Sequence, residues 1–187
     1  MKIRLASPLE KGSIVDGLGV RAVLWTQGCP HNCKGCHNPN THGYNDGFIT
    51  DTFEIKKELN SLELEVGLTF SGGDPFVQPE PCLDIAKYCH KIGLNVWCWT
   101  GYTYEELIKN SNEDPIILEF LKNIDILVDG RFIEKQKSLE CKFRGSKNQR
   151  VIDVQKTLKS KKIVIIKEFD EKKTRKSKKQ KKEEIYI

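Results

Sequence analysis

The sequence has no long hydrophobic run, since none of its apolar stretches approaches the roughly 20 residues that a membrane-spanning helix needs. Its first ten residues also lack the apolar region of a secretory signal peptide. We therefore expect a cytoplasmic protein, in a reducing compartment where cysteines stay free. The chain has 187 residues, of which 38% are hydrophobic and 30% charged. This size and composition predict one soluble domain with a sizeable core.

A second pair of closely spaced cysteines is also missing. Three of the seven cysteines, Cys29, Cys33 and Cys36, fall within eight residues. A structural zinc site usually joins two such short motifs, so this absence weakens a zinc interpretation. His37 or His42 can still complete a closed zinc site, although His37 directly follows a ligand and adjacent residues seldom both face one ion. The remaining cysteines are isolated: Cys82, Cys89, Cys98 and Cys141.

The three clustered cysteines have a spacing that suits an iron–sulfur cluster. Three residues separate the first two thiols, and two residues separate the second from the third. A 4Fe–4S cluster held by protein alone uses four cysteines, so three leave one iron open to another ligand. On spacing alone, an iron–sulfur cluster with an open position is favoured over closed zinc. Such a position turns an electron-transfer cluster into a possible catalyst.

The net charge of +5 hides two unlike parts of the chain. Residues 156–187 carry 13 Lys/Arg and 5 Asp/Glu, whereas residues 1–155 carry 18 and 21. Blocks of like charge are usually disordered and solvated, although a basic tail can also touch nucleic acid or an acidic partner. We expect one domain over residues 1–166 and a charged tail over residues 167–187.

Apolar runs and helix signals alternate along the folded part, after a lead-in over residues 1–19 that ends in a glycine turn. Alternating strands and helices predict an α/β fold in which right-handed βα units build a parallel sheet. Four or five units are too few to close an eight-stranded barrel, so an open, incomplete barrel is expected. Buried Cys82 and Cys89 are expected on one helix. Strands are predicted at 20–25, 66–70, 94–100 and 124–128, and helices after 51, at 79–91, after 103 and at 115–122.

The turn at residues 71–75, Ser-Gly-Gly-Asp-Pro, follows the second predicted strand. Two consecutive glycines let the backbone approach a ligand without interference from a Cβ atom. The cysteine loop follows the neighbouring strand, and parallel strands present their carboxyl-terminal loops at the same edge. We therefore expect the turn to face the cysteine loop, although alone it would be read as an ordinary turn.

Together these motifs resemble the radical S-adenosylmethionine (SAM) superfamily. Asp16-Gly-x-Gly before the first strand and Cys36-His-Asn-Pro after the third cysteine look like its glycyl-radical-enzyme activases. Three more stretches resemble the activases that act on the anaerobic ribonucleoside-triphosphate reductase. They are Ser71-Gly-Gly-Asp-Pro75, Trp97-x-x-Thr-Gly-Tyr102, and Val128-Asp-Gly-Arg-Phe132 with Arg144-Gly-Ser-x-Asn-Gln-Arg150. The resemblance covers roughly residues 13 to 155 and implies an incomplete barrel of the radical SAM type.

The resemblance also implies roles for individual residues. Cys29, Cys33 and Cys36 would ligate one 4Fe–4S cluster, whose fourth iron would bind the amino and carboxylate groups of SAM. One electron would then cleave SAM to methionine and a 5′-deoxyadenosyl radical, which takes hydrogen from a backbone glycine of the reductase. In the wider superfamily an aromatic residue often precedes the third cysteine, where this chain has glycine. The implied SAM contacts are Gly35, Cys36, His37, Gly72, Gly73 and Asp74, and no catalytic side chain beyond the cluster and SAM is implied.

The implied partners are the anaerobic ribonucleoside-triphosphate reductase as protein substrate and a small electron donor such as flavodoxin. No membrane partner is expected. Two other functions remain open from the sequence: a zinc-binding nucleic-acid adaptor that uses the basic tail, and a radical SAM enzyme with a small-molecule substrate. An incomplete barrel leaves its site open on one side, which suits a protruding protein loop better than a small molecule. Nucleic acid is an unlikely partner, because a solvated tail that binds neither nucleic acid nor an acidic protein is favoured.

Overall fold

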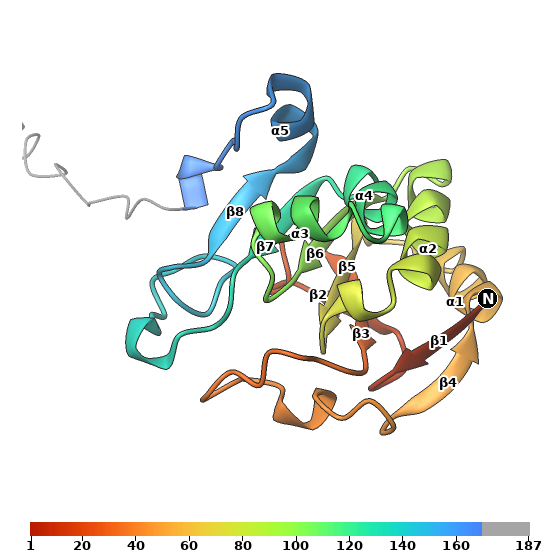
Figure 1. Ribbon diagram of the computed structural model, residues 1–187. Helices are drawn as coiled ribbons and strands as arrows, with labels where there is room; N and C mark the ends of the chain where they lie inside the picture. The colour runs from red at the N-terminus through yellow and green to blue at the C-terminus, as the bar shows by residue number, and fades with distance from the viewer. Residues whose placement is uncertain (170–187) are drawn as a thin grey trace, which may run out of the picture.

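Four parallel strands form the centre of the molecule in a computed structural model that describes residues 1–169. Thr26 lies opposite Gly72, and Phe70 lies opposite Cys98. The parallel core confirms the expected α/β sheet (Figure 1). Its strands, in spatial order, are β3 (Arg21–Thr26), β5 (Gly67–Gly72), β6 (Asn95–Trp99) and β7 (Ile126–Asp129).

Antiparallel strands flank this core, so the expected strict alternation of strands and helices is wrong at both sides. The lead-in over residues 1–19 contains two strands instead of only a turn. These strands are four residues long and are fixed by pairing with partners distant in sequence. The strand order ends at two edge strands, so the barrel is open, as expected. The flanking strands are β1 (Lys2–Leu5), β2 (Glu10–Ser13), β4 (Phe48–Asp51) and β8 (Arg150–Asp153).

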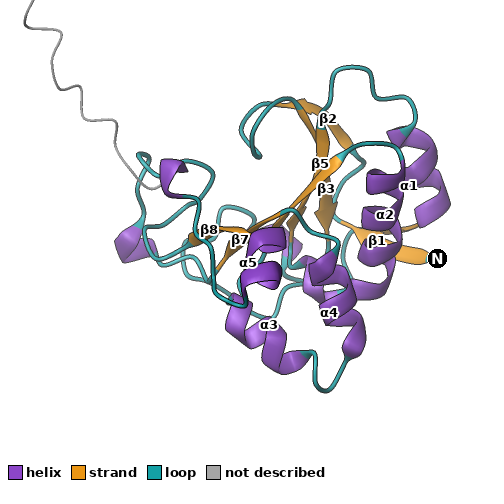
Figure 2. Ribbon diagram, turned by 90° about the horizontal axis from the view of Figure 1, so that it is seen from above, coloured by secondary structure: helices purple, strands orange, loops and turns teal. Residues whose placement is uncertain are grey.

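Helices cover one face of the sheet, as the view in Figure 2 shows for α1, α2 and α4. Cys82 and Cys89 are fully buried on the inner face of α2, and Val96 and Cys98 of β6 belong to the same core cluster. Their predicted place in the core is confirmed. The helices are α1 (Thr52–Leu59), α2 (Pro79–Lys91), α3 (Tyr104–Asn110), α4 (Pro115–Lys122) and α5 (Val154–Ser160). Short 3-10 helices occupy Pro39–Thr41, Pro75–Val77, Glu134–Gln136 and Lys167–Phe169.

Side-chain caps begin two of the helices where the sequence predicts them. The Asp51 carboxylate accepts a hydrogen bond from the Phe53 amide. Thr103 and Glu106 form a reciprocal capping box at the start of α3. Each cap satisfies backbone amides that have no partner within the helix. The cap at Thr103 fixes the point at which the chain turns from β6 into α3.

Aromatic side chains cover the other face of the sheet at one end. Trp97 packs against Phe143 and Phe169, with ring centroids 5.3 and 6.1 Å away. Phe169 is buried, so the folded part includes at least this residue. The rest of the expected charged tail, residues 170–187, lies outside the described residues. Within residues 1–169, no helix is long and apolar enough to cross a membrane.

Candidate active site

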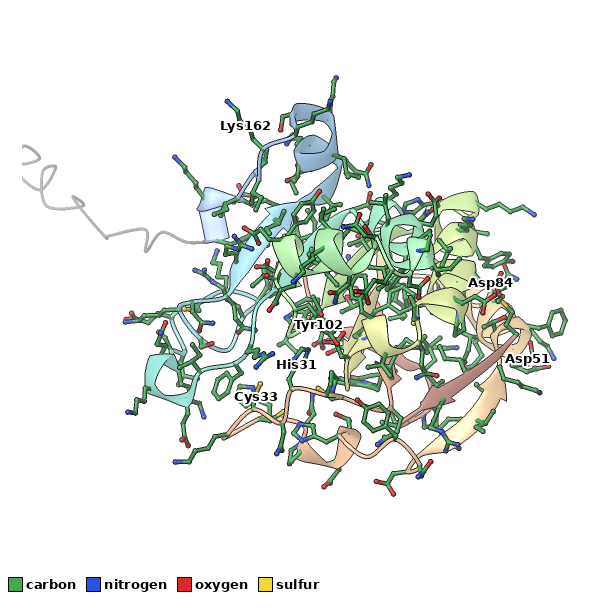
Figure 3. The ribbon with its side chains drawn as sticks, viewed as in Figure 1. His31, Cys33, Asp51, Asp84, Tyr102 and Lys162 are labelled. Atoms are coloured by element: carbon green, nitrogen blue, oxygen red, sulfur yellow. The ribbon has the colours of Figure 1, made fainter. Side chains whose placement is uncertain are left out.

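A cavity of about 460 Å³ lies at the carboxyl-terminal ends of the parallel strands. Its walls come from the cysteine loop after β3, the glycine turn after β5, the end of β6 and the loop after β7. The two motifs that the sequence places at one sheet edge therefore share one cavity. Figure 3 shows His31 and Cys33 of the cysteine loop close to Tyr102, which follows β6.

The cysteine loop brings all three clustered thiols to this cavity. Cys29, Cys33 and Cys36 line it, and each is partly buried. The amide of Cys29 donates to the carbonyl of His42, which anchors the start of the loop. The amide of Cys36 donates to the carbonyl of Cys33, which forms a tight turn between the second and third thiols. These backbone hydrogen bonds shape the loop around the three thiols.

The environment of the thiols suits a metal cluster. Burial raises the pKa of Cys29 to about 11 and also raises the pKa of Cys33. A bound cation reverses this effect because it stabilises the thiolate. The amide of Asn38 donates to the sulfur of Cys36 at 3.4 Å, and an interaction with the backbone of Phe132 offsets part of the effect of burial on the pKa of Cys33. Such bonds adjust the reduction potential of an iron–sulfur cluster.

The placement of the donor side chains does not by itself favour one kind of metal centre. Among residues 1–169, no group of three or more His, Cys, Asp or Glu side chains is placed so that it could hold a metal ion. Neither His37 nor His42 completes a zinc site in this arrangement. The three clustered thiols fit a 4Fe–4S cluster with one position left open, and the thiol of Cys141 lines the same cavity.

The glycine turn is held tightly against the start of the cysteine loop. The amide of Gly73 donates to the Thr26 carbonyl at 2.7 Å, and that of Asp74 donates to the Gly28 carbonyl at 2.8 Å. Gly72 has a φ of +100°, and a Cβ atom there would lie 2.5 Å from the Thr26 carbonyl oxygen. A Cβ atom at Gly73 would lie 2.3 Å from the Gly28 carbonyl oxygen. Both glycines are therefore required by close backbone contact, and both line the cavity.

The carboxylate of Asp74 lies beneath the turn and is completely buried. It accepts hydrogen bonds from the amides of Phe76 and Gly101 and from the hydroxyl of Thr100. Asp74 is not among the residues that line the cavity. These hydrogen bonds hold the turn from below, and direct contact between Asp74 and SAM stays a prediction.

His31, which the sequence analysis did not single out, connects the two motifs. Its ring nitrogen Nε2 lies 2.8 Å from Asp74 Oδ2, and its side chain is 3% exposed. The ring also packs edge-on against Tyr102, with centroids 4.5 Å apart. A Cβ atom at Gly101 would come within 2.2 Å of the ring, so glycine is needed there. No spacing rule marks this contact, because its partners lie more than 40 residues away.

Gly35 and His37 differ in their relation to the cavity. His37 lines it and packs against Phe132, with ring centroids 5.1 Å apart. Gly35 does not line it, and a Cβ atom there would meet the side chain of Glu134 at 3.0 Å. A larger residue at position 35 would therefore point toward Glu134. The apolar surface of the cavity comes from other rings, including Phe132, Trp99 and Phe143.

Residues with no assigned role from the sequence now have defined positions. Trp97 belongs to the aromatic core, whereas Trp99 lines the cavity and donates its indole N–H to the carbonyl of Phe143. Arg150 forms ion pairs with Asp129 and Glu105. The hydrogen bonds that its guanidinium donates to both carboxylates raise the pKa of Arg150 well above its usual range. This cluster fixes β8 against the start of α3, outside the cavity.

The family model and the curated relatives of this chain point to one family. A 4Fe-4S single cluster domain model matches residues 15–152. The anaerobic ribonucleoside-triphosphate reductase-activating protein of Escherichia coli K12 is 37% identical over 145 residues, which cover 73% of this chain and 90% of that protein. The protein of the same name from Haemophilus influenzae is 32% identical, covering 73% and 89%. The solved structure of QueE from Escherichia coli aligns with a TM-score of 0.44 and 13% identity over 55% of this chain and 54% of that chain.

Proposed function

Because this chain belongs to the family of anaerobic ribonucleoside-triphosphate reductase-activating proteins, we propose that it generates a glycyl radical on that reductase. It is a radical SAM enzyme that uses a 4Fe–4S cluster and SAM. When bound, these two groups supply the one-electron cleavage of the carbon–sulfur bond of SAM. The chain supplies binding, orientation and a shaped cavity. The observation that carries this proposal is that three cysteines and a two-glycine turn line one cavity.

Cys29, Cys33 and Cys36 would hold the cluster and leave one iron for SAM. The amides of Gly73 and Asp74 already donate to backbone carbonyls. The groups of the turn that can bind SAM are therefore backbone carbonyl oxygens, which suit the ammonium group of the methionine part of SAM. His37, beside Phe132, would lie along the adenosine, and Asp74 would hold the turn from below. Gly35 would contribute through its backbone, because its Cβ direction is filled by Glu134.

The cavity also bears on the class of substrate. The strand order is open, and the cavity is bounded on one side by loops instead of further strands. A site of this kind admits a protruding backbone segment, as hydrogen abstraction from a glycine of the reductase requires. The electron would come from a small protein such as flavodoxin in the cytoplasm, where the thiols stay reduced. We place the catalytic domain at residues 1–169 instead of ending it at residue 166, because Phe169 is buried against Trp97 and Phe143.

Anaerobic reconstitution tests this proposal. The purified chain is loaded with iron and sulfide, and we expect about four irons per chain from the three-thiolate arrangement. SAM with dithionite is then expected to yield 5′-deoxyadenosine and methionine in equal amounts. Cys33→Ala serves as the control, since it removes one ligand and should lose both iron and cleavage. A chain that retains zinc and never cleaves SAM would refute the proposal.

A further inference from the structure

The loop over residues 131–147, here called the basic loop, has a charge opposite to that of the surrounding body. It carries six Lys/Arg and two Asp/Glu. The rest of residues 1–155 carries 12 Lys/Arg and 19 Asp/Glu. A basic segment on an acidic body produces a local positive potential that extends into solvent over about 10 Å at moderate salt. This asymmetry is not needed to bind the cluster or SAM.

The basic loop lies directly against the cysteine loop. Phe132 of the basic loop packs against His37 of the cysteine loop, with ring centroids 5.1 Å apart. Glu134 pairs with Lys34 at 3.3 Å and fills the space beside Gly35. In Figure 3, Cys33 lies toward the side of the molecule from which the loop after β7 projects. The surface of the basic loop therefore adjoins the place where the second cluster ligand approaches solvent.

Five of the six cationic side chains of the basic loop are exposed, whereas Arg144 and the two aromatic rings line the cavity. Phe132 and Phe143 both line the cavity. Lys34, at the tip of the neighbouring cysteine loop, has a side chain that is 89% exposed. The exposed cations of the basic loop are Arg131, Lys135, Lys137, Lys142 and Lys147.

We infer that the basic loop, with Lys34, is the docking surface for an acidic one-electron carrier protein. This inference rests on the proposed function, which requires an electron at the cluster. One electron leaves the reduced carrier and enters the oxidised cluster, and no atom or proton is transferred. Electron-transfer partners form small, weak interfaces, and complementary charge speeds their encounter. A carrier docked here would reach the cluster beside Cys33 without passing through the cavity.

Other macromolecules fit this surface less well. The protein substrate must present a backbone segment to the cavity itself, so it requires the mouth and not the outer side of the cysteine loop. Single-stranded nucleic acid would be attracted by the charge, but such binding also uses aromatic side chains on which bases stack. The aromatic rings of the basic loop line the cavity and do not provide that platform.

A pair of double variants tests the inference. Lys135→Glu with Lys137→Glu reverses two charges on the basic loop. Lys57→Glu with Lys109→Glu makes the same net change at exposed lysines on α1 and α3. The probe is a photoreduced acidic flavodoxin, and stopped-flow absorbance follows reduction of the reconstituted cluster at low and high salt. Dithionite-driven SAM cleavage is measured in parallel because it bypasses the carrier.

We expect the basic-loop variant to be reduced about tenfold more slowly by flavodoxin at low salt, with most of the salt dependence lost. The α1/α3 variant should change less than about twofold, and cleavage with dithionite should be equal in all three proteins. Equal slowing of both variants would show a net-charge effect and overturn the inference. So would an unchanged flavodoxin rate together with weaker activation of the reductase under dithionite. Absence of dithionite-driven cleavage in the wild type would refute the proposed function itself.

Discussion

The Nε2 atom of His31 lies 2.8 Å from Oδ2 of Asp74, so one buried contact joins the cysteine loop to the glycine turn. The same carboxylate oxygen accepts the amide of Gly101 at the end of β6. Three segments that form the cavity are therefore fixed to one side chain. The expected cluster ligands and the expected SAM-binding turn cannot shift independently.

Asp74→Asn should weaken SAM binding while leaving the cluster in place. The carboxylate now accepts hydrogen bonds from backbone N–H groups. The side-chain NH2 group of asparagine is a donor, so at least one of these N–H groups would face another donor and lose its hydrogen bond. Leaving one such buried donor unpaired costs about 1–3 kcal/mol, which corresponds to roughly a fivefold weaker affinity at the low end. Equilibrium SAM binding and iron content check this. Thr100→Val, which removes a single hydroxyl donor to Asp74, should give a smaller loss. Unchanged SAM affinity in both variants would contradict the role of Asp74.

The seven cysteines should separate into two groups on substitution. Cys33→Ala removes a sulfur that lines the cavity, and we expect it to abolish stable cluster binding. Cys82→Ala and Cys89→Ala remove sulfurs buried beneath α2, so they should retain iron at the cost of about 1 kcal/mol of stability. Iron analysis and thermal unfolding of the three variants test this. Normal iron in Cys33→Ala would defeat the assignment of the ligands.

Cys141 provides a sharper test of the open iron position. This thiol lines the same cavity as the three clustered cysteines and is the fourth cysteine among its lining residues. If the fourth iron is kept for SAM, Cys141→Ser should leave both iron content and SAM cleavage unchanged. Parallel reconstitution with the wild type measures both quantities. Loss of the cluster in Cys141→Ser would mean that a protein thiol occupies the position that SAM requires.

The carboxyl-terminal boundary of the catalytic domain can be placed by truncation. A chain that ends after Phe169 should cleave SAM as the wild type does, because the motif regions lie before it. Phe169→Ala should instead cost about 3 kcal/mol of unfolding free energy, since the ring is buried between Trp97 and Phe143. Urea unfolding compares the two proteins. Loss of cleavage in the truncated chain would show that the last 18 residues belong to the working fold.

Much of the parallel core could be predicted from the sequence because its signals are local. Apolar runs mark β3 and β5, and Thr103 with Glu106 marks the start of α3 by a capping pattern. The flanking strands were missed because they are short and gain their stability from distant partners. Lys2, for example, pairs with Asp51, and Asp129 pairs with Arg150.

The candidate site divides in the same way. The spacing of the cysteines and the two glycines is visible in the sequence, and both motifs line the cavity. The buried position of Asp74 and its contact with His31 depend on how β5, β6 and the cysteine loop pack together. A sequence shows that a carboxylate follows two glycines, but it does not show which side of the turn that carboxylate occupies.

Electron paramagnetic resonance on an anaerobic mixture tests the central claim most directly. The reconstituted protein is combined with the anaerobic ribonucleoside-triphosphate reductase, SAM and dithionite, with Cys33→Ala as the control. We predict a glycyl radical signal on the reductase that requires SAM and is absent with the variant. A mixture in which SAM is cleaved to 5′-deoxyadenosine but no glycyl radical forms on the reductase would contradict the account.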